Sequence, residues 1–203
     1  MGHITANFAG VLVCALVLPA GWLEYRLLEK TRWGVLLGLV NVGLLYGPWV
    51  VLGWASFAGA SFSLATVLGI AMMIVAIMLF VTGATPILRV HGQWKTRPES
   101  LVTTGPYRFV RHPLYVGHAL LIGGGILTAG DRLLFLATPI LWVIAAAASR
   151  YEEVTRIEPC FGDQYRRYKA CTPFLLPIWG WILSALIYFG TAMEVLRAVL
   201  LPQ

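Results

Sequence analysis

Six long runs of apolar residues, separated by more polar segments of different lengths, follow one another along this chain of 203 residues. A helix needs roughly 20 apolar residues, within a usual range of about 17–25, to cross the hydrocarbon core of a bilayer. The pattern therefore predicts an all-α integral membrane protein with about six transmembrane helices. The predicted spans are Ile4–Leu23, Trp33–Trp54, Leu64–Gly83, Leu114–Ala129, Leu133–Ser149 and Phe174–Met193.

The fourth and fifth runs are short, and only Gly130, Asp131 and Arg132 separate them. So short a connection leaves room for a turn alone, and we expect the two runs to form a short helical hairpin. Residues 123–125 are three consecutive glycines, which indicate the close approach of another helix or of a ligand. The chain then divides into an N-terminal three-span region, a central region that contains the hairpin, and a C-terminal span, with bounds 1–83, 84–173 and 174–203.

The positions of Lys and Arg predict how the spans are oriented. Basic residues collect on the cytoplasmic side of a membrane protein, and 13 of the 15 here lie in the segments after the first, third and fifth runs. We therefore expect a multi-pass protein with both termini outside and those three segments in the cytoplasm. The net charge of +6 follows from this distribution and does not indicate a nucleic-acid partner.

The composition agrees with a membrane location. Hydrophobic residues make up 59% of the chain and charged residues 12%, against about 45–50% and about 25% in soluble domains. Too few charges remain to cover a water-facing surface, which excludes a soluble enzyme, a disordered segment and a nucleic-acid module, and makes membrane lipids the expected neighbours. Cys14, Cys160 and Cys171 are odd in number and lack CxxC spacing, so neither a disulfide framework nor a metal site is predicted.

Nearly all the polar chemistry falls in two predicted cytoplasmic segments, of which residues 84–113 are the first. Gly105, Pro106 and Tyr107 have the composition of a tight turn, because glycine tolerates a positive φ and proline fixes its own. Tyr107 has a simpler interpretation, in which it is one of the aromatic residues that line the membrane surface.

The fourth span is predicted to begin just after this turn. Pro113 suits the first turn of a helix, where its missing N–H costs nothing. Arg111 and His112 are then placed at a helix N-terminus, whose free N–H groups favour a carboxylate or a phosphate. The alternative is that Arg111 is one more basic anchor on the cytoplasmic side and that Tyr115 is an interfacial aromatic residue.

Residues 150–173 form the second polar segment. Its first part continues the fifth span as a helix, on which Glu152 and Glu153 lie three or four residues from Arg150 or Arg156. Solvated ion pairing is one interpretation of these acids. A Glu153 that points back at the membrane would instead be functional, because an ionisable residue is costly there.

Phe161 and Gly162 are expected to end this helix, since glycine commonly terminates helices. Tyr165 and Tyr168 are three residues apart and therefore share one face of a short basic helix that follows. They are either interfacial aromatics or part of a site.

Taken together, the two segments resemble the integral-membrane methyltransferase family of isoprenylcysteine carboxyl methyltransferase, which is similar to phospholipid methyltransferases. That family has a Gly-Pro-Tyr turn, an Arg-His-Pro-x-Tyr motif at the start of a membrane helix, and a later Glu-containing helix followed by Phe-Gly-x-x-Tyr-x-x-Tyr and a proline. The matching landmarks cover about residues 100 to 173 and are Gly105–Tyr107, Arg111–Tyr115, Glu153, Phe161–Tyr168 and Pro173.

The resemblance implies a site for S-adenosylmethionine (SAM), whose product is S-adenosylhomocysteine (SAH). It also implies that residues 84–173 are the catalytic region, open to the cytosol, and that a lipid-like or hydrophobic acceptor enters from the bilayer. Carried over by position, the cofactor-binding residues would be Gly105, Pro106, Tyr107, Arg111, His112, Pro113, Tyr115, Tyr165 and Tyr168. The residues near the reacting centre would be Glu153, Arg150 and His112.

The sequence departs from this family's pattern in three places. The family often has two adjacent acids in phase with Phe-Gly, whereas Val154 takes the second place here and Glu152 lies one residue early. Residues 158–160 read Glu-Pro-Cys, and they interrupt a stretch that is usually continuous helix. The sixth span is more than simple members need, and we expect it to form either a contact in a homo-oligomer or a wall of the acceptor site.

The sequence leaves the acceptor open among three classes. A carboxylate, as in isoprenylcysteine, is already nucleophilic and would be held by Arg150. A phospholipid amine must first lose a proton, which would make Glu153 or His112 a general base. A small hydrophobic thiol is the third class.

Two other functions remain as alternatives. Sterol-type reductases, which bind NADPH, share Arg-His-Pro-x-Tyr but usually have Asn and Glu where this chain has Leu114 and His118. A non-enzymatic membrane protein, such as a small transporter, would place its polar residues in the middle of the membrane at broken helices. The clustering of Arg, His and Glu in the predicted inside segments favours a methyltransferase over both.

Overall fold

The computed structural model describes residues 63–91, 100–128, 130, 135–136 and 138–200, and everything below concerns these residues. All the regular elements among them are helices and none is a strand, in agreement with the predicted all-α class. The predicted spans Ile4–Leu23 and Trp33–Trp54 lie outside them, as do Asp131 and Arg132 of the predicted hairpin turn. Six spans and a complete hairpin therefore stay predictions.

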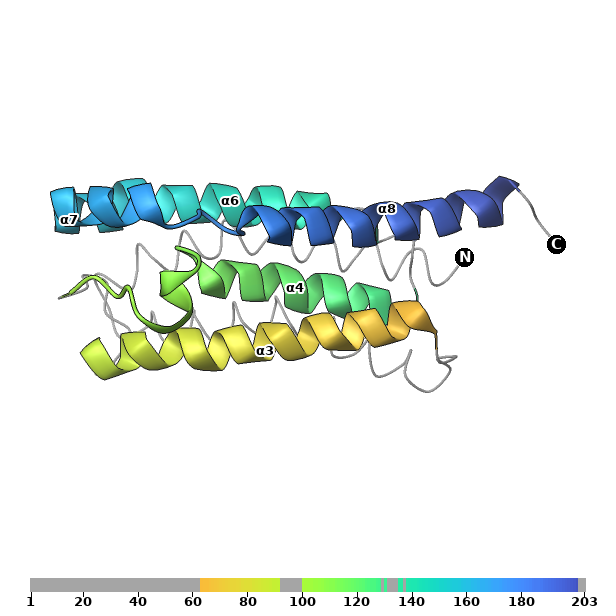
Figure 1. The fold of residues 1–203 in the computed structure, drawn as a ribbon, viewed down its shortest axis with the longest axis horizontal. Coiled ribbons are helices and arrows are strands. Elements are labelled where there is room, and N and C mark those ends of the chain that lie inside the picture. The colour runs from red at the N-terminus through yellow and green to blue at the C-terminus, as the bar shows by residue number, and fades with distance from the viewer. Residues whose placement is uncertain (1–62, 92–99, 129, 131–134, 137, 201–203) are drawn as a thin grey trace, which may run out of the picture. The chain divides into compact units, whose positions relative to one another are not determined.

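Helices α3 (Leu64–His91) and α4 (Pro113–Thr128) pack side by side along their length (Figure 1). The bounds of α4 agree closely with the fourth predicted span. Helix α3 begins where the third span was predicted to begin, but it continues past the predicted end at Gly83. It passes through Pro86, which removes one backbone hydrogen bond without ending the helix, so the cytoplasmic connection was predicted to begin too early.

Glycines bring the backbones of α3 and α4 together. A Cβ atom added at Gly69 of α3 would lie 2.6 Å from the carbonyl oxygen of Gly124 in α4, and one added at Gly124 would lie 2.7 Å from the carbonyl oxygen of Gly69. Real Cβ atoms do not approach backbone oxygens this closely. Of the two explanations for the triple glycine, helix packing therefore accounts for Gly124.

We expect Gly124→Ala to destabilise the protein and Gly125→Ala to leave it unchanged or more stable. The new methyl group at 124 would also meet Met72 Cβ and Met73 Cγ at 3.0 Å, and overpacking of this kind costs about 1–3 kcal/mol. At Gly125 none of the described residues lies within 4 Å, so alanine should add only its helix propensity, up to about 1 kcal/mol. Thermal unfolding in detergent measures both, and equal behaviour of the two variants would contradict the packing argument.

Helix α6 (Pro139–Glu152) continues without a break into a π-helical turn, η2 (Glu153–Ile157), and then into α7 (Glu158–Cys171). The predicted continuation of the fifth span into the second polar segment is confirmed. A proline ring clashes with the carbonyl four residues earlier in a regular α-helix. The wider π turn immediately before Pro159 relieves that clash, so the Glu-Pro-Cys stretch changes the helix type rather than ending the helix.

Gly162 marks the predicted end of that helix, and the structure places a sharp kink there. Its φ of +46° and ψ of −119° are readily adopted by glycine alone, so the helical axis changes direction before Tyr165 and Tyr168. The stretch after the kink is the short basic helix expected from the sequence. It ends at Cys171.

Helix α8 (Ile178–Leu200) begins later and ends later than the sixth predicted span. Its side chains touch α6, since the ring centroids of Trp181 and Trp142 lie 5.3 Å apart, and they also touch the segment before α6, since the Tyr188 hydroxyl donates to the Leu136 carbonyl at 3.2 Å. Pro177 stands immediately before the first residue of α8, where its missing N–H breaks no helical hydrogen bond.

Length and composition identify one described helix, Leu64–Ile87, as able to cross a membrane; Pro113–Thr128 and Ile178–Glu194 are apolar but shorter. Large apolar side chains are exposed on the outer faces of α3 and α8, among them Met78 at 59% and Ile178 at 80%. Exposed apolar faces of this extent fit a membrane protein.

Candidate functional site

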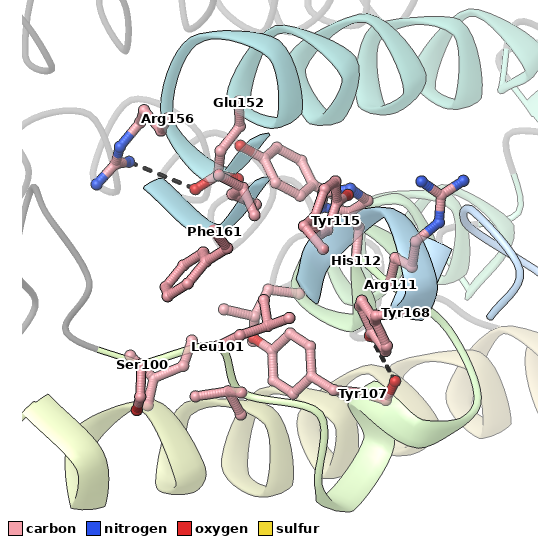
Figure 2. A pocket seen from close by; sticks show the side chains of 15 residues that line it. Ser100, Leu101, Tyr107, Arg111, His112, Tyr115, Glu152, Arg156, Phe161 and Tyr168 are labelled. Atoms are coloured by element: carbon pink, nitrogen blue, oxygen red, sulfur yellow. Dashed lines mark hydrogen bonds and ion pairs between the residues drawn. The ribbon is translucent and has the colours of Figure 1, made fainter. Parts of the chain in front are cut away.

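A cleft opens where the loop before α4, the N-terminal end of α4 and the η2–α7 segment meet. The cavity itself has a volume of about 180 Å³. Because the cleft is open, the volume rises to about 880 Å³ when the space at its mouth is included. Figure 2 shows Glu152, Arg156 and Phe161 on one side of it and Ser100, Leu101 and Tyr107 on the other. Its lining residues are Ile87, Ser100, Leu101, Val102, Tyr107, Arg111, His112, Leu114, Tyr115, Glu152, Arg156, Ile157, Phe161, Tyr165 and Tyr168.

The predicted Gly-Pro-Tyr turn is present as the 3₁₀ turn η1 (Gly105–Arg108), with Gly105 at a φ of +61°. Gly105 packs against α3, because a Cβ atom added there would lie 3.5 Å from Pro86. The turn directs Tyr107 toward the cleft. The backbone carbonyl of Tyr107 accepts a hydrogen bond of 2.6 Å from the hydroxyl of Tyr168 in α7. This bond joins two of the predicted landmarks, 61 residues apart.

Arg111 and His112 stand immediately before Pro113, the first residue of α4, as the sequence predicts. The Arg111 N–H donates to the Pro173 carbonyl at 2.9 Å, which attaches this loop to the segment after α7. Phe174 lies against both side chains, with its ring centroid 5.0 Å from the Arg111 guanidinium carbon and 5.4 Å from the His112 ring. The Nε of Arg111 is buried without a hydrogen-bond partner among the described residues.

Glu153 lies at the centre of the buried polar contacts beside the cleft and is 0% exposed. Its Oε1 accepts hydrogen bonds from Arg111, from the Tyr165 hydroxyl and from His112 Nε2, the last at 3.0 Å. Its Oε2 accepts one from Arg150 at 2.9 Å. Burial alone raises the pKa of this carboxyl, but the hydrogen bonds from His112, Tyr165 and Arg150 and the charge of Arg111 together lower its pKa to about 2.

The two tyrosines of α7 stay protonated in this site. Burial and the hydrogen bond to Glu153 raise the pKa of Tyr165, and burial raises the pKa of Tyr168 to about 12. Both hydroxyls therefore act as hydrogen-bond donors at neutral pH.

Glu152 faces the cleft, whereas its neighbour Glu153 faces the interior. Arg156 Nη1 donates to Glu152 Oε1 at 3.4 Å, and Glu152 also interacts with the hydroxyl of Tyr115 (Figure 2). The predicted pairing of Glu152 with Arg156 is therefore present, but on the wall of the cleft rather than on a fully solvated face. The sequence left solvated pairing open for both acids, because it does not show which face of the helix packs against the rest of the site.

The predicted site residues fall into two groups. Tyr107, Arg111, His112, Tyr115, Tyr165 and Tyr168 line the cleft. Gly105, Pro106, Pro113, Arg150 and Glu153 do not line it; the first three shape the backbone and the last two form an ion pair behind the wall.

Other cleft residues were not predicted as site residues from the sequence. Phe161 was assigned to the helix end, and Ser100, Leu101 and Val102 stand just before the recognised turn. Their position immediately next to the landmarks was the only signal in the sequence.

The residues present fit an adenosyl cofactor. Its adenine needs an apolar and aromatic slot, which Leu101, Val102 and Phe161 can supply, and its methionine end needs charged partners, for which Arg111, Arg156 and Glu152 are available. The buried Nε of Arg111 has no partner in the described part of the chain, so a ligand oxygen would satisfy it.

Comparison with known proteins finds similarity to methyltransferases. The model of a family described as phospholipid methyltransferase matches residues 64–164. "Methanethiol S-methyltransferase 1" of Bradyrhizobium diazoefficiens is 30% identical over 80 residues, which are 39% of this chain and 27% of that protein. "Methanethiol S-methyltransferase" of Crocosphaera subtropica is 28% identical over 83 residues, 41% of this chain and 31% of that protein.

The similarity to these two relatives covers less than a third of their length. No solved structure matches the chain. The family match includes α3, α4, α6, η2 and the first part of α7, and therefore most of the residues around the cleft.

Proposed function

We propose that this protein is a membrane-embedded, SAM-dependent methyltransferase with a hydrophobic or lipid-like acceptor, since the model of the phospholipid methyltransferase family matches residues 64–164. The observation that carries the proposal is the cleft itself. Six of the residues expected to hold SAM line one space, although they come from segments about 60 residues apart.

SAM carries a methyl group on a charged sulfonium, which is already activated for transfer. The protein's task is then to bind, align the reactants and exclude water, and positioning of this kind lowers a barrier by about 7–11 kcal/mol. The rings of Tyr107 and Tyr115 would favour the positive sulfonium through cation–π attraction, worth about 0.5–2 kcal/mol each. Ile87 and Leu114 make the adjoining wall apolar.

We propose a small thiol as the acceptor class. Both relatives are named for a thiol substrate, and the apolar wall of the cleft suits a hydrophobic one. The thiol must lose its proton before its sulfur can attack the methyl carbon. His112 can receive that proton, because its Nε2 donates to Glu153 and leaves Nδ1 as the acceptor nitrogen of the neutral ring.

The other acceptors and functions are separated by direct assay. Membranes that contain the protein would be given labelled SAM with methanethiol, phosphatidylethanolamine vesicles or farnesylcysteine, and we expect label on the thiol. Thermal-shift titration with SAH and with NADPH separates methyl transfer from reduction, because a ligand at about 100 times its Kd stabilises the folded state by about 2.7 kcal/mol. Stabilisation by NADPH alone, or by neither compound, would overturn the proposal.

Tyr168→Phe should weaken SAH binding about 5- to 10-fold. The change removes the hydroxyl that holds the Tyr107 carbonyl at 2.6 Å, a net contribution of about 1 kcal/mol, and it frees one wall of the cleft. Tyr188→Phe is the matched control, since that hydroxyl also donates to a backbone carbonyl, that of Leu136, but does not line the cleft. Isothermal titration with SAH measures both variants, and equal affinities would contradict the placement of the cofactor.

A further inference from the structure

We infer that Glu153 is a positioning residue, a buried carboxylate that fixes Arg111, His112 and Tyr165 in the cleft wall and exchanges no proton during catalysis. This inference rests on the proposed function. It assigns to Glu153 a role different from the one that the family resemblance implied, which placed this acid near the reacting centre.

The geometry gives the first reason. Glu153 is fully buried and is not among the residues that line the cleft, so neither SAM nor an acceptor in the cleft would touch its oxygens. Glu152, one residue earlier, is the acid that the cleft presents to a ligand.

The hydrogen bonds give the second reason. A carboxylate has about four acceptor positions, and Glu153 uses both oxygens to bind donors from three places in the chain: the loop before α4, the end of α6, and α7. The titratable and charged groups that face it are Arg111, His112, Arg150 and Tyr165, and each of them is a donor. A proton added to Glu153 would have to displace one of them.

The position in the chain gives the third reason. Glu153 is the first residue of the π turn η2, and π turns re-aim side chains that a regular helix would carry elsewhere. From there it reaches His112 and Arg111, 41 and 42 residues earlier, and Tyr165, 12 residues later. Three residues of the cleft wall therefore depend on one carboxylate for their orientation.

The bond to His112 links this arrangement to the reaction. A carboxylate that accepts from Nε2 fixes the ring in the tautomer whose Nδ1 is free to accept a proton. Glu153 therefore acts through His112, in the same way as it acts on the cofactor through Arg111 and Tyr165.

The test compares Glu153→Gln, Tyr165→Phe and the double variant in the full-length protein, using the SAH Kd from titration and the pH profile of methyl transfer. We expect Glu153→Gln to raise the SAH Kd by about 10- to 100-fold, since small misplacements in a site have effects of this size. The acidic limb of the pH profile should persist, because the group that titrates is not Glu153. Tyr165→Phe alone should raise the Kd less, and it should add little when combined with Glu153→Gln because both changes break the same contact.

Two results would overturn the inference. One is a Glu153→Gln variant that binds SAH as tightly as wild type but whose pH profile of methyl transfer has lost its acidic limb. That result would identify Glu153 as the base. The other is full additivity of the two substitutions. Failure of the wild-type protein to bind SAH would overturn the proposed function and this inference together, whereas either result above, obtained with SAH-binding wild type, overturns the inference alone. Tyr165→Phe removes a single hydroxyl, so it provides a readout even where the Glu153→Gln variant does not fold.

Discussion

Replacing Arg111 with leucine should abolish measurable SAH binding and destabilise the folded protein by about 3 kcal/mol or more. Arg111 joins three parts of the site: its guanidinium pairs with Glu153, lies over the Phe174 ring and lines the cleft. Its side chain is only 10% exposed, and removal of one partner of a buried ion pair costs about 3–5 kcal/mol because the other charge is left buried. Titration with SAH and thermal unfolding in detergent measure the two effects.

Arg108→Leu is the matched control for this substitution. Arg108 lies three residues earlier in the same loop, is exposed, and contacts the ring of Phe109, itself exposed. The loss of one positive charge near the predicted membrane surface is common to both variants, so a difference between them isolates the buried contacts. Equal SAH affinities for Arg111→Leu and Arg108→Leu would show that Arg111 is only a basic anchor, the alternative interpretation of the sequence.

The stability of the protein should fall steeply in acid because of Glu153. Its pKa is about 2 in the folded state against an ordinary value of 4.5, so the folded state binds the proton more weakly than the unfolded chain does. The stabilisation is complete above about pH 4.5 and is lost as the pH falls through 2. A pKa difference of this size corresponds to stability on the order of 3 kcal/mol.

Thermal unfolding between about pH 7 and pH 2 checks this prediction. Wild type and Glu153→Gln share all other carboxylates, so the difference between their pH dependences belongs to Glu153. Asp163→Asn serves as a second control, because its side chain is 82% exposed and its pairing with Arg166 lies on the surface, where ion pairs contribute little. A Glu153→Gln variant that loses as much stability in acid as wild type would contradict the buried ion cluster.

The predicted membrane location connects these measurements to function. The cleft lies at the end of α3 and α4 at which the apolar run gives way to polar residues, and α3 is the described helix long enough to cross a bilayer. An acceptor dissolved in lipid would meet such a cleft at the membrane boundary, while a charged cofactor would reach it from water. The multi-pass topology and the cytoplasmic orientation stay predictions from the distribution of Lys and Arg.

The sequence determined the class of the protein and the landmarks of the site. Apolar runs of about 20 residues favour the helix in lipid, because a helix of that length crosses the hydrocarbon core and pairs its backbone polar groups within the run. The turn at Gly105, the helix start at Pro113 and the kink at Gly162 were predictable for a similar reason, since each depends on a local backbone preference. The Arg-His-Pro-x-Tyr and Phe-Gly-x-x-Tyr-x-x-Tyr motifs then indicated the family.

Only the tertiary structure decided which side chains share the cleft. Helical geometry points Glu152 and Glu153 about 100° apart. Which of the two faces the interior depends on how η2 packs against the loop before α4, which is a contact between residues 41 or 42 positions apart. Likewise, Pro86 was expected to stand beyond the end of the third span, yet packing of η1 against α3 accompanies a helix that continues through it. Local preferences are set by neighbours in sequence, whereas burial and ion pairing depend on neighbours in space, and for Glu153 those neighbours are Arg111, His112 and Tyr165.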